Sequence, residues 1–114
     1  MTHEMKLNKA PFEQIRDGKK TIELRLNDEK RQQVKVGDRI VFRSLARPEE
    51  TVLTEVIALH RFPSFARLYE ALPLLACGYT EDQLPDAKPE DMDAYYSPEK
   101  QTQYGVLGIE LKVI

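Results

Sequence analysis

The feature that most constrains the fold is the run of residues 51–59, which has apolar side chains on both faces of an extended chain. Val52 and Val56 would point to one face, and Leu53 and Ile57 to the other, because successive side chains of a strand alternate. A long strand that is apolar on both faces suits a closed or nearly closed barrel. We therefore start from a β-barrel.

Four shorter segments supply further predicted strands. Residues 5–7 form a short first strand, and a turn at Val36-Gly37-Asp38 leads into a strand over residues 39–43. Residues 21–26 alternate, which predicts a half-buried strand with Glu23 and Arg25 on a charged outer face. At the C-terminus the inward positions are Leu107, Ile109, Leu111 and Val113.

Short helices separate these strands. Pro11 fits a first helical turn and Gly18 a helix end, and Ser64 can cap a helix that stops before Pro73. Pro89 and Pro98 each indicate the first residue of a short helix. The prediction is an α+β fold in which residues 1–114 form a single small barrel domain, a usual size for one domain.

Composition excludes several classes of protein. A single cysteine, Cys77, excludes an intramolecular disulfide and a multi-cysteine metal centre, and His3 and His60 are the only histidines. The longest apolar stretch, around residues 72–77, is too short to cross a bilayer, and the first residues lack the apolar core of a signal peptide. We expect a cytoplasmic protein with no metal, no cofactor and no membrane partner.

Charge is divided unevenly along the chain. Residues 1–47 carry 12 Lys and Arg against 7 Asp and Glu, a net +5, whereas the remaining residues carry 5 against 12, a net −7. If the basic residues converge, their face could attract phosphate. The alternative is that both halves intermix in the fold and cancel. The basic set comprises Lys19, Lys20, Arg25, Lys30, Arg31, Lys35, Arg39, Arg43 and Arg47.

Residues 18–25 hold the strongest candidate site. Strand alternation puts Glu23 and Arg25 on one face, and Lys20 joins them only if it precedes the regular strand or lies at a bulge. Lysine and arginine can hold a phosphate or a base edge while glutamate accepts from an amine or a ribose hydroxyl. A lysine beside a carboxylate can also act as a general acid or base. The plainer interpretation is a solvated strand face with surface ion pairs.

This segment resembles the ASCH domain family, whose G-x-K-x-x-E-x-R pattern is met by Gly18, Lys20, Glu23 and Arg25. The resemblance extends over almost the whole chain and implies a PUA-like β-barrel with short helices at its openings. It further implies that RNA or a nucleotide-like ligand binds in a small cationic cleft. The residues that we expect to bind are Lys19, Lys20, Glu23, Arg25 and Tyr104.

Some ASCH-like proteins are enzymes, which gives an alternative. A bacterial group that resembles this chain hydrolyses N4-acetylcytidine and related N-acylated cytosines with a lysine, a threonine and a glutamate. Its lysine corresponds to Lys20, but its threonine falls at Glu23, and Glu70 and Glu81 are candidates for its glutamate by order alone. If this chain is a hydrolase of modified nucleosides, Lys20 and Glu23 are its expected catalytic residues. A third alternative is an adaptor whose basic face binds an acidic protein.

Other residues are given structural or surface roles. Tyr104 either stacks on a base or packs at the edge of the core, and Tyr95 and Tyr96 are expected to pack within a helix. Cys77 is expected to be a small buried hydrophobe, and His60 to be structural. The acidic residues expected to form solvated surface are Glu81, Asp82, Asp86, Glu90, Asp91 and Asp93.

Overall fold

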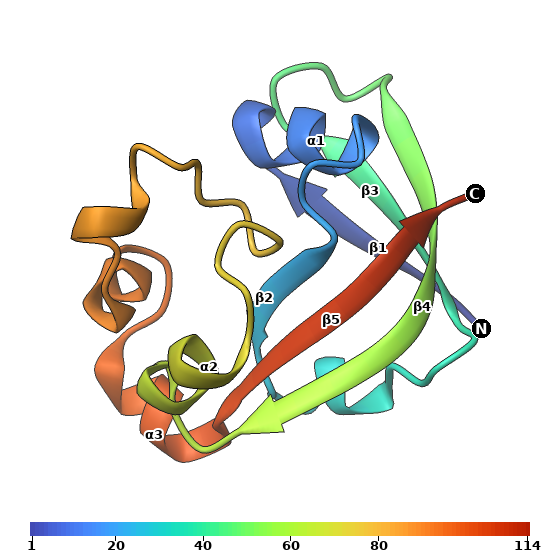
Figure 1. Ribbon diagram of the computed structural model, residues 1–114. Helices are drawn as coiled ribbons and strands as arrows, with labels where there is room; N and C mark the ends of the chain where they lie inside the picture. Colours follow the sequence, from blue (N-terminus) through green and yellow to red (C-terminus); the bar gives the residue numbers. More distant parts are fainter.

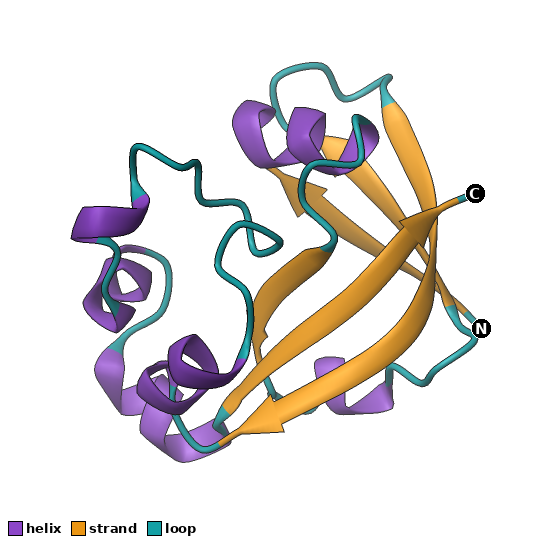
Figure 2. Ribbon diagram, viewed as in Figure 1, coloured by secondary structure: helices purple, strands orange, loops and turns teal.

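The computed structural model describes residues 1–114 and is built on one five-stranded sheet (Figures 1 and 2). The strands are β1 (Thr2–Leu7), β2 (Ile22–Leu26), β3 (Arg39–Ser44), β4 (Thr51–Phe62) and β5 (Val106–Val113). The helices are α1 (Lys9–Arg16), α2 (Phe65–Ala71) and α3 (Pro98–Tyr104), with 3-10 turns η1 (Arg31–Gln33), η2 (Leu84–Asp86) and η3 (Pro89–Ala94). No helix is long and apolar enough to cross a membrane.

The sheet is a curled half-barrel, open along one seam. Its strand order is β1-β3-β4-β5-β2, with β1 parallel to β3 and every other pair antiparallel. The α+β class and the PUA-like architecture are confirmed, although β1 and β2 form the two edges and do not pair. Figure 1 shows β2 and β5 on the side of the sheet that faces the helical segments.

Strand β4 is apolar on both faces because it joins the two halves of the sheet. Residues 51–55 pair with β3, and residues 54–62 pair with β5 across a register shift between Val56 and Ala58. The strand continues to Phe62, three residues beyond the predicted end.

Two apolar cores lie on opposite sides of β5. The first includes Phe12 and Ile15 of α1 together with Leu107, Ile109 and Leu111 of β5. The second includes residues of α2 and consists of Ile22, Leu24, Leu26, Phe65, Leu68, Cys77, Met92 and Val106. The prediction that Val113 points inward is wrong, since neither core extends beyond Leu111 on β5 and Val113 is exposed.

The predicted helix boundaries are close to the observed ones. The Ser64 hydroxyl accepts a hydrogen bond from the Arg67 amide and so caps α2. Helix α2 ends at Ala71 because Leu72, which precedes Pro73, is extended. Pro89 and Pro98 open η3 and α3 as predicted.

Candidate functional site

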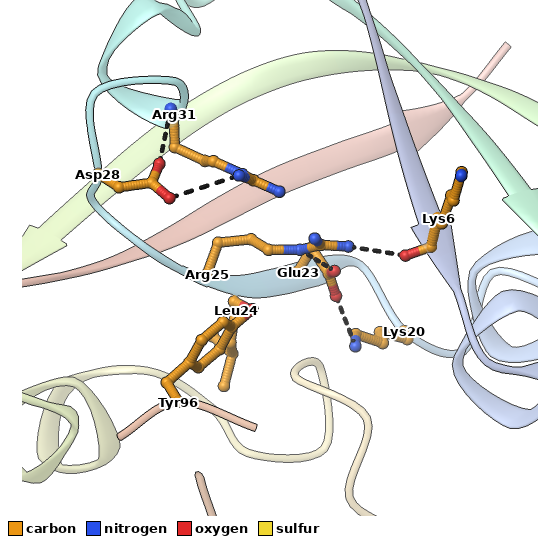
Figure 3. A network of polar contacts seen from close by, with 8 residues as sticks. All are labelled: Lys6, Lys20, Glu23, Leu24, Arg25, Asp28, Arg31 and Tyr96. Atoms are coloured by element: carbon orange, nitrogen blue, oxygen red, sulfur yellow. Dashed lines mark hydrogen bonds and ion pairs between the residues drawn. The ribbon is translucent and has the colours of Figure 1, made fainter. Parts of the chain in front are cut away.

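The site is built on the start of β2, beside the open seam of the sheet. Strand β2 begins at Ile22, so Lys20 precedes the regular strand and meets the condition for joining Glu23 and Arg25. The Lys20 Nζ atom lies 2.8 Å from Oε1 of Glu23, and Nε of Arg25 lies 2.7 Å from Oε2. Both oxygens of one carboxylate are thus held by two cations (Figure 3).

The prediction of a charged outer face for β2 is wrong at Glu23, which is only 3% exposed. The far side of this strand is covered by segments distant in sequence. The Ala76 carbonyl accepts hydrogen bonds from the amides of Thr21 and Ile22, and Arg25 Nη2 donates to the Lys6 carbonyl at 3.1 Å. The ion pairs are therefore largely buried, unlike those of a solvated strand face.

Charge keeps the Glu23 carboxylate ionised despite its burial. Burial alone would raise the pKa of Glu23, but the charges and hydrogen bonds of Lys20 and Arg25 outweigh it and hold the pKa below its usual value. Burial would likewise lower the pKa of Arg25, and the Glu23 charge overcomes this effect. Glu23 at neutral pH is an acceptor, not a proton donor.

A cavity of about 810 Å³ opens over this group. Lys20, Glu23 and Arg25, here called its floor, belong to the lining together with apolar residues such as Leu24 and Met92. Its volume lies within the range of about 300–1,000 Å³ usual for small-molecule sites. The cavity could accommodate a ring system against apolar walls with polar atoms facing the floor.

Carboxylates also line the cavity. Asp82, Asp86 and Asp91, here called the acidic wall, belong to its lining, and Asp82 and Asp86 are exposed as expected of solvated surface. With Glu23 there are four anionic side chains in the lining, against the three cations Lys6, Lys20 and Arg25. The expected cationic cleft is therefore a cavity lined by both basic and acidic side chains.

A chain of hydroxyl groups holds the acidic wall in place. The hydroxyl of Tyr69 lies 2.7 Å from that of Tyr79, which donates to Oδ2 of Asp91 at 2.7 Å. The Tyr79 hydrogen bond, together with one from the Lys88 amide, lowers the pKa of Asp91. Burial and these bonds to Tyr69 and Asp91 raise the pKa of Tyr79. Tyr79 therefore enters the lining as a neutral phenol.

Two expected binding residues lie outside the lining. Lys19 is exposed and absent from the lining, and Tyr104 packs on the second core. Glu70 and Glu81, the candidates for a hydrolase glutamate, are also absent from the lining, and Glu70 is paired with Arg67 on α2. The structure brings together Lys20, Glu23 and Arg25 only.

Of the two tyrosines expected to pack, only Tyr96 does. Its ring is stacked on Phe65 with ring centroids 6.3 Å apart. Tyr95 is 67% exposed and lies at the edge of the cavity, because it follows the end of η3 and no element covers it. Tyr95 is therefore the most exposed of the three tyrosines in the lining, Tyr79, Tyr95 and Tyr96, and Tyr104 is not among them.

The remaining residues have structural surroundings. His60 lies 3.0 Å from Glu110 on the neighbouring strand and outside the cavity lining. Cys77 belongs to the second core, and burial raises the pKa of its thiol to about 11, so the thiolate needed by a nucleophile is not formed at neutral pH.

Most of the basic residues of the first half do not reach the cavity. Lys6, Lys20 and Arg25 are the three of these twelve residues in the lining, and Arg31, Arg43 and Arg47 pair with nearby carboxylates. The excess of basic residues in the first half of the sequence therefore does not form a single basic face at this site.

Sequence patterns missed several residues of the lining. For Lys6 the sequence does contain an indication. It lies between Met5 and Leu7 in a predicted strand, so its side chain must point to the opposite face from theirs. No sequence pattern indicates Gln14, Gly78 or Tyr79. These residues reach the cavity only through contacts between segments about 60 residues apart.

Comparison with known proteins identifies similar chains. The family model described as ASCH domain matches residues 5–114. The crystal structure of the hypothetical protein PH0355 has a TM-score of 0.81 and 31% identity, covering 100% of both chains. The solution NMR structure of protein PF0455 from Pyrococcus furiosus has a TM-score of 0.70 and 31% identity, covering 100% of this chain and 98% of that one. The comparison with curated proteins gives no match.

Proposed function

Because the chain belongs to the ASCH domain family, we propose that it binds RNA or a nucleotide-like ligand in the cavity above Lys20, Glu23 and Arg25. The observation that carries the proposal is the buried Glu23 carboxylate, whose two oxygens hold Lys20 and Arg25 at the cavity floor. An ion-pair group that is mainly structural would not need to face a cavity of about 810 Å³.

The hydrogen-bonding capacity left at the floor defines what a ligand must supply. An ammonium group has three donors, and Glu23 takes one from Lys20, so two remain. The Nη1 atom of Arg25 has no protein partner, because Nε donates to Glu23 and Nη2 to Lys6. A base carbonyl or ring nitrogen would accept from these groups, as unpaired bases do in proteins.

The walls suit the rest of a nucleotide-like ligand. The apolar side chains of Leu24 and Met92 can contact a ring face, and exposed Tyr95 can stack on a base at the opening. The carboxylates of Asp82 and Asp86 can accept from an exocyclic amine or from ribose hydroxyls. An unpaired base with its sugar therefore matches the pocket better than a run of phosphates.

The geometry favours binding over hydrolysis of N-acylated cytosines. That chemistry uses a threonine at the position of Glu23, and neither Glu70 nor Glu81 reaches the cavity. The lowered pKa of Glu23 also makes it a weak proton acceptor for a general-base role. The Lys20–Glu23 pair inside a cavity is the one observation that supports catalysis, so turnover is tested alongside binding.

The test measures fluorescence anisotropy of a labelled single-stranded RNA over a salt series. We compare the wild-type protein with Lys20→Ala and with Lys19→Ala, a matched control whose side chain is exposed and outside the cavity. We expect Lys20→Ala to weaken binding about tenfold at every salt concentration and to leave the salt slope nearly unchanged, because the lost contact is to a base and not to a phosphate. Lys19→Ala should change binding much less.

Equal effects of the two substitutions would place RNA on the outer surface and overturn the assignment to the cavity. If no RNA binds, calorimetric titration with the four common nucleosides and N4-acetylcytidine tests the single-ligand form of the proposal. Release of acetate from N4-acetylcytidine, lost in Lys20→Ala, would replace binding by hydrolysis as the function.

A further inference from the structure

Gln14, near the end of α1, contacts both the backbone at Lys19 and Lys20 and the segment that contains Gly78. Its backbone carbonyl accepts from the amides of Lys19 at 2.9 Å and Lys20 at 3.0 Å. Its side-chain Nε2 atom donates to the Gly78 carbonyl at 3.1 Å. One residue thus joins the approach to β2 to the segment that follows α2, which lies about 60 positions away.

Gly78 supplies the space in which the Lys20 side chain lies. Its φ of +108° is one that residues with a β-carbon rarely adopt. A β-carbon at this position would lie 3.1 Å from Cδ of Lys20 and 3.2 Å from Oε1 of Gln14. Both contacts are closer than the separation of about 3.5–4.0 Å at which carbon atoms attract. The missing side chain therefore leaves room for the methylene stem of Lys20.

Hydrogen bonds also attach the segment that contains Gly78 to the start of β2. The Ala76 carbonyl accepts from the amides of Thr21 at 2.9 Å and Ile22 at 3.0 Å. Lys20 is consequently held between two anchored backbones, with its side chain only 11% exposed. Its amine has little freedom to leave Glu23.

We propose that Gln14 and Gly78 are positioning residues that hold the Lys20 amine on Glu23 and direct its two remaining protons into the cavity. The assignment of Lys20 to ligand contact rests on the proposed function above. The holding of Lys20 on Glu23 does not, and it can be measured in the protein without a ligand.

The experiment follows acetylation of each lysine at pH 7.5 by an N-hydroxysuccinimide ester, with site-resolved mass spectrometry. In the wild type, Lys20 should react more slowly than exposed Lys19. In Gln14→Ala we expect the Lys20 rate to rise about three- to tenfold, the value of one lost hydrogen bond. The Lys19 rate should stay unchanged, and an unchanged midpoint of urea unfolding separates local release of Lys20 from global unfolding. Alanine keeps the helix stable, and Glu13→Ala on the same helix is the control.

Gly78→Ala should raise the Lys20 rate at least as much, by displacing the lysine stem directly. If the strained backbone keeps that variant from folding, Gln14→Ala decides the question alone. An unchanged Lys20 rate in folded Gln14→Ala would overturn the proposal, even if Lys20→Ala abolishes RNA binding. A raised rate with wild-type RNA affinity would leave the positioning role in place and remove Lys20 from ligand contact.

Discussion

Arg25 and Lys6 lie on the two edge strands of the half-barrel, and Nη2 of Arg25 donates to the Lys6 carbonyl oxygen at 3.1 Å. The same guanidinium donates through Nε to Glu23 at 2.7 Å. One side chain therefore spans the seam between β1 and β2, where the backbone makes no ladder. Both residues line the cavity, so the cavity and the seam occupy the same place.

Arg25→Lys should weaken this link because an ammonium cannot imitate the fixed fork of the guanidinium. We expect a loss of about 1–2 kcal/mol in the free energy of unfolding, measured by urea titration, from one or two imperfect hydrogen bonds. Arg43→Lys is the matched control, since Arg43 also bonds a carboxylate, Glu4, and a carbonyl, that of Pro48, but at the surface. Equal losses in the two variants would contradict a special role for the seam.

Glu23→Gln should be strongly destabilising because it leaves Lys20 and Arg25 without their buried counter-charge. Breaking a buried pair in this way costs about 3–5 kcal/mol, and we expect the lower end because the cavity admits water. The control is Glu4→Gln, which removes a 2.8 Å pair with Arg43 at the surface. A surface pair contributes little to stability, so similar unfolding midpoints for the two variants would disprove burial as the cause.

The Asp38 carboxylate makes stability depend on acid pH. It accepts hydrogen bonds from His3 and from the Lys35 amide, which lower its pKa from the usual 3.8 to about 2. A depressed pKa in the folded state contributes stability above pH 4 that is lost as the pH falls toward 2. The gap in unfolding midpoint between wild type and Asp38→Asn should therefore shrink from pH 4 to pH 2.

Asp86→Asn is the control for this pH dependence, because the Asp86 side chain accepts no hydrogen bond within the protein. This variant removes one carboxylate charge without removing the contacts of Asp38, and it is measured across the same pH interval. A gap for Asp38→Asn that remains constant down to pH 2 would show that the contacts with His3 and Lys35 are not maintained in solution.

Gly105→Ala should destabilise the protein more than Gly37→Ala. Both glycines have a positive φ, +72° and +93°, so both variants lose the conformational freedom of glycine. A β-carbon at position 105 would also lie 2.9 Å from the Phe62 carbonyl oxygen, whereas position 37 is open. Overpacking against backbone typically adds about 1–3 kcal/mol, and urea unfolding should show this excess. Equal losses would mean that β4 and α3 can move apart.

Part of the site could be predicted from the sequence alone. The pairing of Glu23 with Arg25 follows from their spacing on a strand, and the motif with Gly18 and Lys20 indicates the family. For Lys20 the sequence allows only a conditional prediction: its side chain joins Glu23 and Arg25 if the regular strand begins after it or if it lies at a bulge. That condition depends on Ile22 being the first residue to pair with β5, which is a long-range contact.

The sequence by itself determined the local elements: the alternation along β2 and β5, the cap of α2 at Ser64 and the helices that begin at Pro89 and Pro98. These follow from interactions among residues a few positions apart, which the sequence displays directly. Only the tertiary structure decided that Glu23 is buried, that Gly78 lies against Lys20 and that three aspartates line the same cavity. The burial of a strand residue and the charges around it depend on which distant segments pack against the strand. The alternation of residues along the strand does not contain that information.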